Sequence, residues 1–200
     1  YLLDAIEDKA CCYISDTDFE LNDDTLAIVI KDVRAAMPII SKLYFGDLSK
    51  EISMIGITGT KGKSTTTYIT KQILDDYLES VGANSVALSS GIENYDGKTL
   101  SESHLTTPEN LELYEHMNNA INSDISHMVM EVSSQALKYR RVDGITYEVG
   151  CFLNIGEDHI SPIEHPDYED YLQSKLSIFG ACKKACINLD CKEQDSIRRE

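Results

Sequence analysis

The sequence predicts an α/β protein with a mainly parallel sheet, flanking helices and a phosphate-binding loop (P-loop). From residue 52 onward, short apolar segments typical of buried strands alternate with segments whose apolar residues recur at helical spacing. This alternation is typical of strand–helix–strand units, which build parallel sheets covered by helices. In Ile52–Thr67 (ISMIGITGTKGKSTTT), a strand pattern also runs through a glycine-containing loop into a helix pattern. Residues 1–50 follow a different pattern and predict part of a smaller α/β domain before a central domain at 51–200.

Composition limits the possible classes of protein. The 200 residues are 42% hydrophobic, which suits a globular core, and no apolar run approaches the about 20 residues that span a membrane. A formal net charge of −16 argues against a general nucleic-acid binder, so an anionic ligand needs local positive charge, which Lys61 and Lys63 supply. No signal peptide is visible, which predicts reduced cysteines and a cytoplasmic protein. The spacing of Cys182, Cys186 and Cys191 lacks a CxxC knuckle and disfavours a zinc site.

The first fifty residues predict two strands and a helix. Ala10–Ile14 and Leu26–Ile30 have strand composition and are separated by an acidic turn region, Asp16–Asp24. A helix is expected from Asp32, whose side chain is a suitable N-cap. Pro38 falls inside that helix pattern, so it is expected to kink the helix or to move its start.

The P-loop prediction rests on residues 52–67. The apolar Ile52–Ile57 predicts a buried strand, and the loop that follows has glycines at positions where backbone N–H groups can surround a phosphate. Lys63 is placed to reach the β and γ phosphates, and the adjacent Ser64 hydroxyl to hold Mg²⁺. The general P-loop pattern has a glycine where Ile57 stands, and this spacing also disfavours a P-loop kinase.

Further elements follow in alternation. A helix at Ser64–Ser80 ends before Gly82, and the Asp96-Gly97 pair predicts a hairpin turn. Thr107 and Pro108 predict the start of the next helix, with Thr107 as its N-cap. The apolar stripes predicted for these two helices are Tyr68, Ile69, Ile73, Leu74, Tyr77 and Leu78, then Leu111, Tyr114, Met117, Ala120 and Ile121. The remaining predicted elements are strands at Ser85–Leu88, His127–Val132, Val149–Ile155 and Ala185–Leu189, and helices at Ser134–Arg140 and Tyr168–Phe179.

Polar residues that follow the predicted strands are the candidates for chemistry. Glu131 ends one strand, and Asp158 with His159 follows another. Together with Ser64 they suit one or two hard cations beside phosphates. Taken singly, each also has an ordinary interpretation, with Glu131 as a solvated strand end and His159 as a turn residue capped by Asp158.

The other polar candidates are less distinctive. Ser133 or Ser134 is expected to cap a helix, and either Arg140 or Arg141 to bind an anionic substrate while the other faces solvent. From the residue type alone, Lys175 is expected at the surface. His104, His116 and His165 have no pattern that separates them from surface or loop residues.

Five motifs in order resemble the Mur ligases, and the chain looks most like the branch that adds the third residue of the peptidoglycan stem peptide. The motifs are GITGTKGKST (56–65), TTPE (106–109), MEVSSQAL (130–137) with RRV (140–142), NIGEDH (154–159) and YLQSK (171–175). The resemblance covers nearly the whole chain, and the unusual glycine spacing of the loop is normal in that family. It implies an ATP-binding central domain at 51–200 after the end of a UDP-binding domain at 1–50, with a C-terminal ligase domain absent.

The resemblance also implies roles for individual residues. The phosphates of ATP would bind Gly59, Thr60, Lys61, Gly62, Lys63, Ser64 and Thr65. Magnesium, usually two ions, would bind Ser64, Glu131, His159 and Lys175. The UDP-muramoyl-dipeptide would contact Thr106, Thr107, Ser133 and Arg141. Lys175 matches a lysine that the family carbamylates, which reverses the surface interpretation, whereas Gln135 departs from the histidine that the family often has.

The implied reaction is ATP-dependent amide formation. ATP phosphorylates the terminal carboxylate of UDP-N-acetylmuramoyl-L-alanyl-D-glutamate, and the amine of an amino acid then displaces phosphate, with Lys63, Lys175 and His159 as the implied catalytic residues. The added amino acid, diaminopimelate or lysine, is left open. Another Mur-type ligase, a folylpolyglutamate synthetase and a nucleotide-binding module without ligase chemistry remain alternatives, and no nucleic-acid partner is expected.

Overall fold

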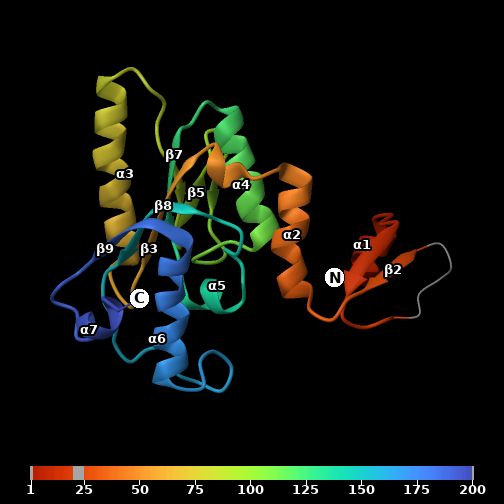
Figure 1. Ribbon diagram of the computed structural model, residues 1–200. Coiled ribbons are helices and arrows are strands. Elements are labelled where there is room, and N and C mark those ends of the chain that lie inside the picture. The colour runs from red at the N-terminus through yellow and green to blue at the C-terminus, as the bar shows by residue number, and fades with distance from the viewer. Residues whose placement is uncertain (1, 20–24, 200) are drawn as a thin grey trace.

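The computed structural model describes residues 2–19 and 25–199, and its centre is a seven-stranded sheet (Figure 1). The strand order is β6-β5-β4-β7-β3-β8-β9, in which β4, β7, β3, β8 and β9 pair in parallel and β5 pairs antiparallel with both β4 and β6. The strands are β3 (Ser53–Thr58), β4 (Ala87–Ser89), β5 (Glu93–Tyr95), β6 (Leu100–Glu102), β7 (His127–Glu131), β8 (Tyr147–Phe152) and β9 (Cys182–Ile187). The predicted α/β class with a mainly parallel sheet is confirmed.

Helices alternate with these strands. They are α1 (Leu2–Glu7), α2 (Val33–Phe45), α3 (Lys63–Ser80), α4 (Asn110–Asn122), α5 (Ser134–Lys138), α6 (Tyr168–Leu176) and α7 (Gln194–Ile197), with short 3₁₀ helices η1 (Leu48–Lys50) and η2 (Ser177–Ala181). None of the helices in the described residues is long and apolar enough to cross a membrane. The helix predicted at Tyr168–Phe179 is found as α6, which η2 follows directly.

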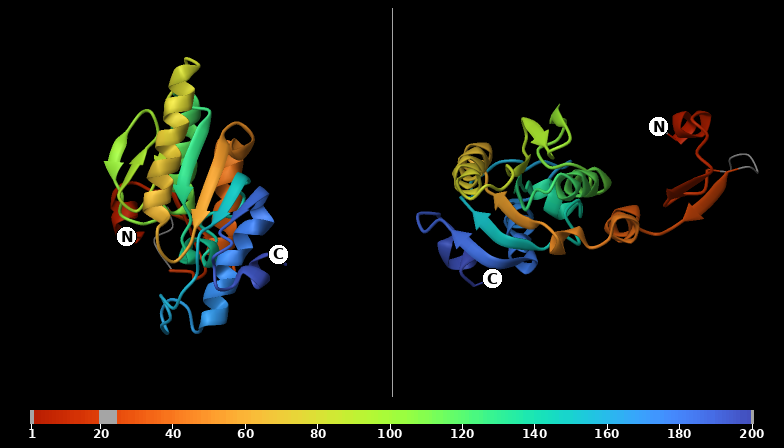
Figure 2. Two further views of the ribbon diagram at one scale, coloured as in Figure 1. Left: turned by 90° about the vertical axis from the view of Figure 1, so that its left-hand side faces the viewer. Right: turned by 90° about the horizontal axis from the view of Figure 1, so that it is seen from above.

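The N-terminal strands form a separate small sheet. β1 (Cys12–Ser15) and β2 (Leu26–Val29) pair in parallel, and Figure 2 shows this pair beyond α2, away from the large sheet. Part of the predicted acidic turn, residues 20–24, lies outside the described residues. Helix α2 begins as predicted, because the Asp32 side chain accepts a hydrogen bond from the N–H of Ala35 at 2.9 Å. Pro38 lies inside α2 and did not move its start.

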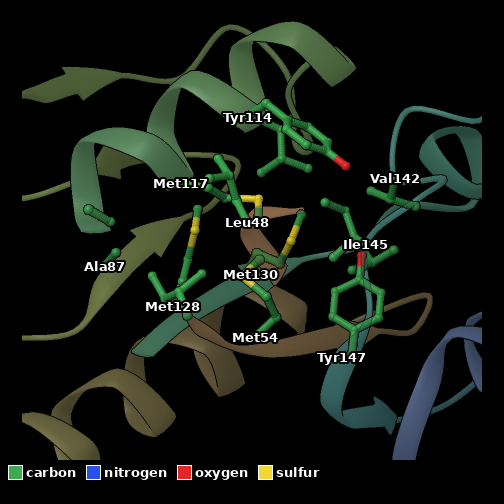
Figure 3. Close-up of a cluster of buried hydrophobic side chains, with 14 of the residues drawn as sticks. Leu48, Met54, Ala87, Tyr114, Met117, Met128, Met130, Val142, Ile145 and Tyr147 are labelled. Atoms are coloured by element: carbon green, nitrogen blue, oxygen red, sulfur yellow. The ribbon is translucent and has the colours of Figure 1, made fainter. Parts of the chain in front are cut away.

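Apolar side chains cover both faces of the central strands. On the α4 side, Met54, Met128 and Met130 pack with Tyr114 and Met117, and each of these side chains is buried (Figure 3). On the α3 side, a second buried cluster contains Ile57, Leu78, Val86 and Val129. Strands β3 and β7 are therefore held from both sides, and this fixes their carboxyl ends, where polar residues follow.

Two predicted apolar stripes are only partly correct. On α3, Leu74 and Leu78 pack on the sheet as predicted, whereas Ile69, Ile73 and Tyr77 are exposed and Thr67 is buried. Thr67 is polar, so the apolar pattern did not include it. On α4, Leu113 is buried whereas the predicted Leu111 is exposed.

Helix α4 also starts later than predicted. Its first residue is Asn110, and its N-cap is Glu109 rather than Thr107. The Thr107 hydroxyl instead donates to the carbonyl of Glu131 at 2.9 Å and accepts from the N–H of Ser133 at 3.0 Å. This cross-connection fixes Thr107 to the end of β7, so it is unavailable as a cap.

Candidate active site

The loop between β3 and α3 has the geometry of a P-loop. Gly62 adopts a φ of 83°, in the left-handed region that favours glycine, and directly precedes α3. A Cβ added at Gly59 would lie 3.0 Å from the Cβ of Leu153. Glycine is thus required at 59 and 62, whereas Ile57 fills the core cluster beneath α3. This explains in physical terms why the glycines are displaced from the general P-loop spacing.

Asn154 holds this loop from the segment that follows β8, the strand next to β3. Its Oδ1 accepts from the N–H of Thr60 at 3.1 Å and from the N–H of Lys61 at 2.9 Å, and its Nδ2 donates to the carbonyl of Lys61 at 2.9 Å. The N-terminus of α3 has no side-chain cap. The first N–H groups of an 18-residue helix are therefore left for an anion, as phosphate binding requires.

Two lysine amines converge on one carbonyl of the loop. Lys63 Nζ donates to the Gly59 oxygen at 3.0 Å, and Lys175 Nζ donates to the same oxygen at 2.9 Å. Lys175 is only 1% exposed, so the interpretation as a surface lysine is wrong. Burial, together with the positive charge of Lys63, lowers the pKa of Lys175 to about 7. Burial also lowers the pKa of Lys63. Two cations this close favour an anionic ligand.

Glu131 lies at the end of β7 and is only 1% exposed, so it is not a solvated strand end. Its Oε1 accepts from the N–H of Gly91 at 2.8 Å, and its negative charge favours the charged form of Lys63. The carboxylate is thus fixed by one backbone donor within the field of the P-loop lysine.

One cavity of about 220 Å³ brings together predicted residues from all three proposed roles. Its lining is Lys63, His104, Leu105, Thr106, Ser133, Ser134, Gln135, Arg141, His159 and Lys175. Residues predicted for phosphate, for metal and for the second substrate therefore share one space at the carboxyl edge of the sheet, where α/β proteins place their ligands. Thr107 is fully buried beside it, and His104 joins the lining although no pattern marked it.

The remaining predicted residues lie around this cavity. Ser64 and Thr65 are in the first turn of α3. Lys61 is exposed and pairs with Asp158 at 2.9 Å. Ser133 is the N-cap of α5, as predicted for one of the two serines, and accepts from the N–H of Ala136 at 3.1 Å.

The two adjacent arginines differ as expected. Arg140 is exposed, with a φ of 62°, whereas Arg141 lines the cavity. Arg141 Nε lies 2.8 Å from the Glu109 carboxylate, an ion pair that restricts the guanidinium.

Four residues that sequence reasoning left without a role also shape the site. They are Asn154, Glu164, His165 and Tyr171. The Tyr171 hydroxyl is 3.0 Å from the Thr60 hydroxyl, and its ring lies 4.8 Å from Lys175 Nζ. Asn154 lies in the motif NIGEDH and Tyr171 in the motif YLQSK, so the motifs could have indicated these two residues. His165 is fully buried between Asp170 and Ser134, and Ser134 is 31 positions away in the chain, so no local pattern indicates this contact.

The residues present fit a nucleotide better than they fit a metal alone. Within the described residues, no group of three or more His, Cys, Asp or Glu side chains could hold a metal ion by itself. Ser64, Glu131 and His159 would supply only part of a coordination shell. Magnesium commonly takes one or two carboxylates and completes its shell with phosphate oxygens and water, so this set suits a nucleotide-bound Mg²⁺.

Comparisons with known proteins identify the family of this chain. Residues 57–200 match the family model of the Mur ligase middle domain. The UDP-N-acetylmuramyl-tripeptide synthetase of Bifidobacterium longum is 39% identical over 201 aligned positions, covering 100% of this chain and 38% of the relative. The UDP-N-acetylmuramoyl-L-alanyl-D-glutamate–L-lysine ligase of Streptococcus pneumoniae D39 is 40% identical over 190, covering 95% of this chain and 38% of the relative.

A solved structure is also similar. That of a UDP-N-acetylmuramoyl-L-alanyl-D-glutamate–2,6-diaminopimelate ligase aligns with a TM-score of 0.76 and 25% identity, covering 98% of this chain and 38% of that one. The chain thus spans well under half the length of the proteins it matches. The family match covers most of the chain and includes the P-loop, Glu131, His159 and Lys175, so the protein belongs to the Mur ligase family.

Proposed function

We propose that this chain supplies the ATP-binding and carboxylate-activating part of a ligase that adds an amino acid to UDP-N-acetylmuramoyl-L-alanyl-D-glutamate in peptidoglycan biosynthesis. The observation that carries the proposal is the pair of lysine amines on the Gly59 carbonyl, in a cavity that Ser133 and Arg141 also line. The names of the two relatives support the substrate.

The reaction we propose has two steps. The γ-phosphoryl group of ATP passes to the terminal carboxylate, giving an acyl phosphate and ADP. The amine of the amino acid then attacks the acyl carbon, and phosphate leaves. Phosphoryl transfer depends on alignment and on neutralisation of charge more than on covalent help from the protein. Lys63 is placed to neutralise the phosphates, and the backbone from Gly59 to Thr65 to align them.

Ser64, Glu131 and His159 would hold Mg²⁺, usually two ions, which would neutralise phosphate charge when bound. Lys175 would contribute after carbamylation, in which its neutral amine adds to CO₂ and releases a proton. A buried amine whose pKa is about 7 is neutral often enough for this addition, and the carbamate converts a cation into an oxygen ligand. A buried ammonium could not serve as a metal ligand.

Of the four residues assigned to the UDP-muramoyl-dipeptide, Thr106, Ser133 and Arg141 line the cavity and would contact it, with Arg141 as the cation for its carboxylate. Thr107 is fully buried and would act indirectly by bracing Ser133, whose backbone N–H donates to its hydroxyl. Residues 1–50 are proposed as the end of a UDP-binding domain and 51–200 as the ATP-binding domain. The amino acid, diaminopimelate or lysine, would be chosen by polypeptide outside this chain, and the reaction would occur in the cytoplasm.

Nucleotide binding tests the proposal on this chain. We expect Lys63→Ala to weaken ATP binding at least tenfold in calorimetry while circular dichroism stays unchanged. The matched control is Lys61→Ala, which removes an equal but exposed charge, and it should lose much less. Equal affinity of wild type and Lys63→Ala would contradict the assignment of the loop.

Product formation tests the substrate. The complete gene product should release ADP and phosphate with UDP-muramoyl-dipeptide and either diaminopimelate or lysine. A panel with folate and other muramoyl peptides separates the related ligases. Metal-dependent ATP binding without amide formation on any of these would instead support a nucleotide-binding module.

A further inference from the structure

The ring of His159 is held by a carboxylate from its own loop. Its Nδ1 lies 3.0 Å from Oε1 of Glu164, and the ring lines the cavity together with Lys63 and Lys175. Nε2 makes no hydrogen bond with any residue that the structure describes. One ring nitrogen is thus engaged by a carboxylate, and the other has no hydrogen-bond partner among the described residues.

Glu164 is itself fixed in place. Its Oε1 also accepts from Nε2 of Gln135 at 2.7 Å, and its backbone carbonyl accepts from Nζ of Lys138 at 2.9 Å. Its N–H donates to the Ser161 hydroxyl at 3.2 Å. Gln135 is the position that departs from the family, and here its amide gives the carboxylate a second donor. Glu164 is therefore not a freely rotating surface side chain.

The backbone between the two residues is equally constrained. The N–H of His165 donates to the carbonyl of His159 at 3.2 Å, which closes the turn that carries Glu164. The ring of His165 is fully buried, with Nδ1 2.6 Å from Asp170 on α6 and Nε2 3.0 Å from Ser134 on α5. The turn is thus tied to α5 and α6, two of the helices whose residues line the cavity.

We propose that Glu164 is the positioning residue of His159: it accepts the Nδ1 hydrogen, fixes the tautomer whose lone pair is on Nε2, and directs that lone pair into the cavity toward a divalent cation. An ionised carboxylate can only accept, so the nitrogen facing it must carry the hydrogen. Metal-binding histidines commonly donate their second ring N–H to a carboxylate, which sets tautomer and ring orientation. The role of the cation rests on the proposed function, whereas the tautomer does not.

The tautomer can be observed without any ligand. Long-range ¹H–¹⁵N correlation spectra of the ¹⁵N-labelled chain, at a pH where the ring is neutral, distinguish the two forms, and His159→Gln identifies the signal. We expect Nδ1–H in the wild type and a shift toward Nε2–H in Glu164→Ala. Glu157→Ala, which removes an exposed carboxylate from the same loop, should keep the wild-type pattern. Nε2–H in the wild type itself would overturn the proposal, even if Glu164→Ala did not fold.

A Mn²⁺ titration followed by broadening of the His159 ring signals tests the direction of the lone pair. Glu164→Ala should need about 10–100-fold more Mn²⁺ than wild type or Glu157→Ala. Equal sensitivity in wild type and Glu164→Ala would overturn the positioning role. Failure of the proposed function would appear elsewhere, as ATP binding that does not depend on Lys63.

Discussion

Burial of the Lys175 amine predicts a pH-dependent stability. Its pKa is about 7 in the folded protein and 10.5 in the unfolded chain. Between these values the unfolded chain binds more protons, so the free energy of unfolding rises with pH from about 7 to 10.5. Between pH 7 and 9.5, we expect the free energy of unfolding of wild type to rise by about 3 kcal/mol relative to that of Lys175→Met. Urea unfolding in CO₂-free buffer measures this, and parallel stability curves for the two proteins would contradict it.

The same residue gives a prediction for activity. In the complete gene product, Lys175→Ala should lose ligase activity and recover part of it with added short carboxylates, because a small carboxylate can replace the carbamate in the space that the side chain leaves. The control is Lys63→Ala, for which the same carboxylates should restore nothing. Absence of rescue in Lys175→Ala would count against a carbamate at this position.

Gly59 lies so close to the backbone after β8 that a side chain there should disturb the loop. The Cβ of Gly59→Ala would meet Leu153 Cβ at 3.0 Å and the backbone N of Asn154 at 3.4 Å. We expect at least a tenfold loss of ATP affinity in calorimetry. Gly180→Ala is a matched control, because nothing lies within 4 Å of the added Cβ. Similar losses in both variants would contradict a local effect.

Residue types alone could predict the phosphate loop but not the surroundings of each side chain. Lys63 and Ser64 follow a strand and a glycine loop within a few positions, so the roles proposed for them can be predicted from the sequence alone. Lys175 owes its burial to Tyr171 and to a loop more than a hundred positions earlier, and a lysine on a helix is ordinarily exposed. Only the motif resemblance could anticipate it.

At the scale of elements, Asp96 joins the β5–β6 hairpin to α4. Its carboxylate accepts from the N–H of Thr99 at 2.7 Å and from Nδ2 of Asn119 at 2.9 Å, and it lies 2.8 Å from Nδ1 of His116. Although burial opposes ionisation, these bonds lower the pKa of Asp96 from 3.8 to about 2. The ionised carboxylate of Asp96 therefore connects the hairpin to α4.

This charge gives a second pH dependence, in which the free energy of unfolding again rises with pH, but in the acidic range. A lowered carboxyl pKa contributes stability that is complete above 3.8 and is lost as pH falls through about 2. We expect Asp96→Asn to lower the free energy of unfolding by about 2 kcal/mol at pH 7, and the difference to shrink toward pH 2. Denaturant unfolding across this range tests it. Glu115→Gln, on the exposed side of α4, should cost much less.

The positions of elements followed from the sequence more closely than their ends did. The Asp96-Gly97 turn and the Asp32 cap are local, and both are found where predicted. Helix α4 begins three residues after Thr107, because that hydroxyl bonds the end of a distant strand instead. Contacts of this kind depend on strand neighbours, and chain order does not reveal that β3 lies between β7 and β8.

At the scale of the whole molecule, the small sheet has far less support than the large one. Among the strands that the structure describes, β1 and β2 pair with no other strand, and Leu26, Ile28 and Val29 are exposed. Helix α2 instead packs against α4, with Phe45 against the main core. The boundary predicted at residue 50 therefore stays open to test.

Hydrogen exchange can locate that boundary. We expect amides of 12–15 and 26–29 to exchange at least a hundredfold faster than those of β3 and β7, because local opening there exposes little buried surface. Amides of α2 should follow the large sheet if the boundary lies before the helix, and the small sheet if it lies at residue 50. Uniform protection throughout would contradict two separate units.

The carbonyl oxygen of Gly59 accepts from both lysine amines, so the vibration of this carbonyl can report on the state of the site. A carbonyl that receives two charge-assisted hydrogen bonds is strongly polarised, so its infrared stretch should be lowered. In a chain with a ¹³C label at this carbonyl, the frequency of the stretch would shift in two steps. One step would occur when phosphate draws Lys63 away, and the other when carbamylation converts Lys175. One vibrational band could thus record the order in which the nucleotide and CO₂ arrive.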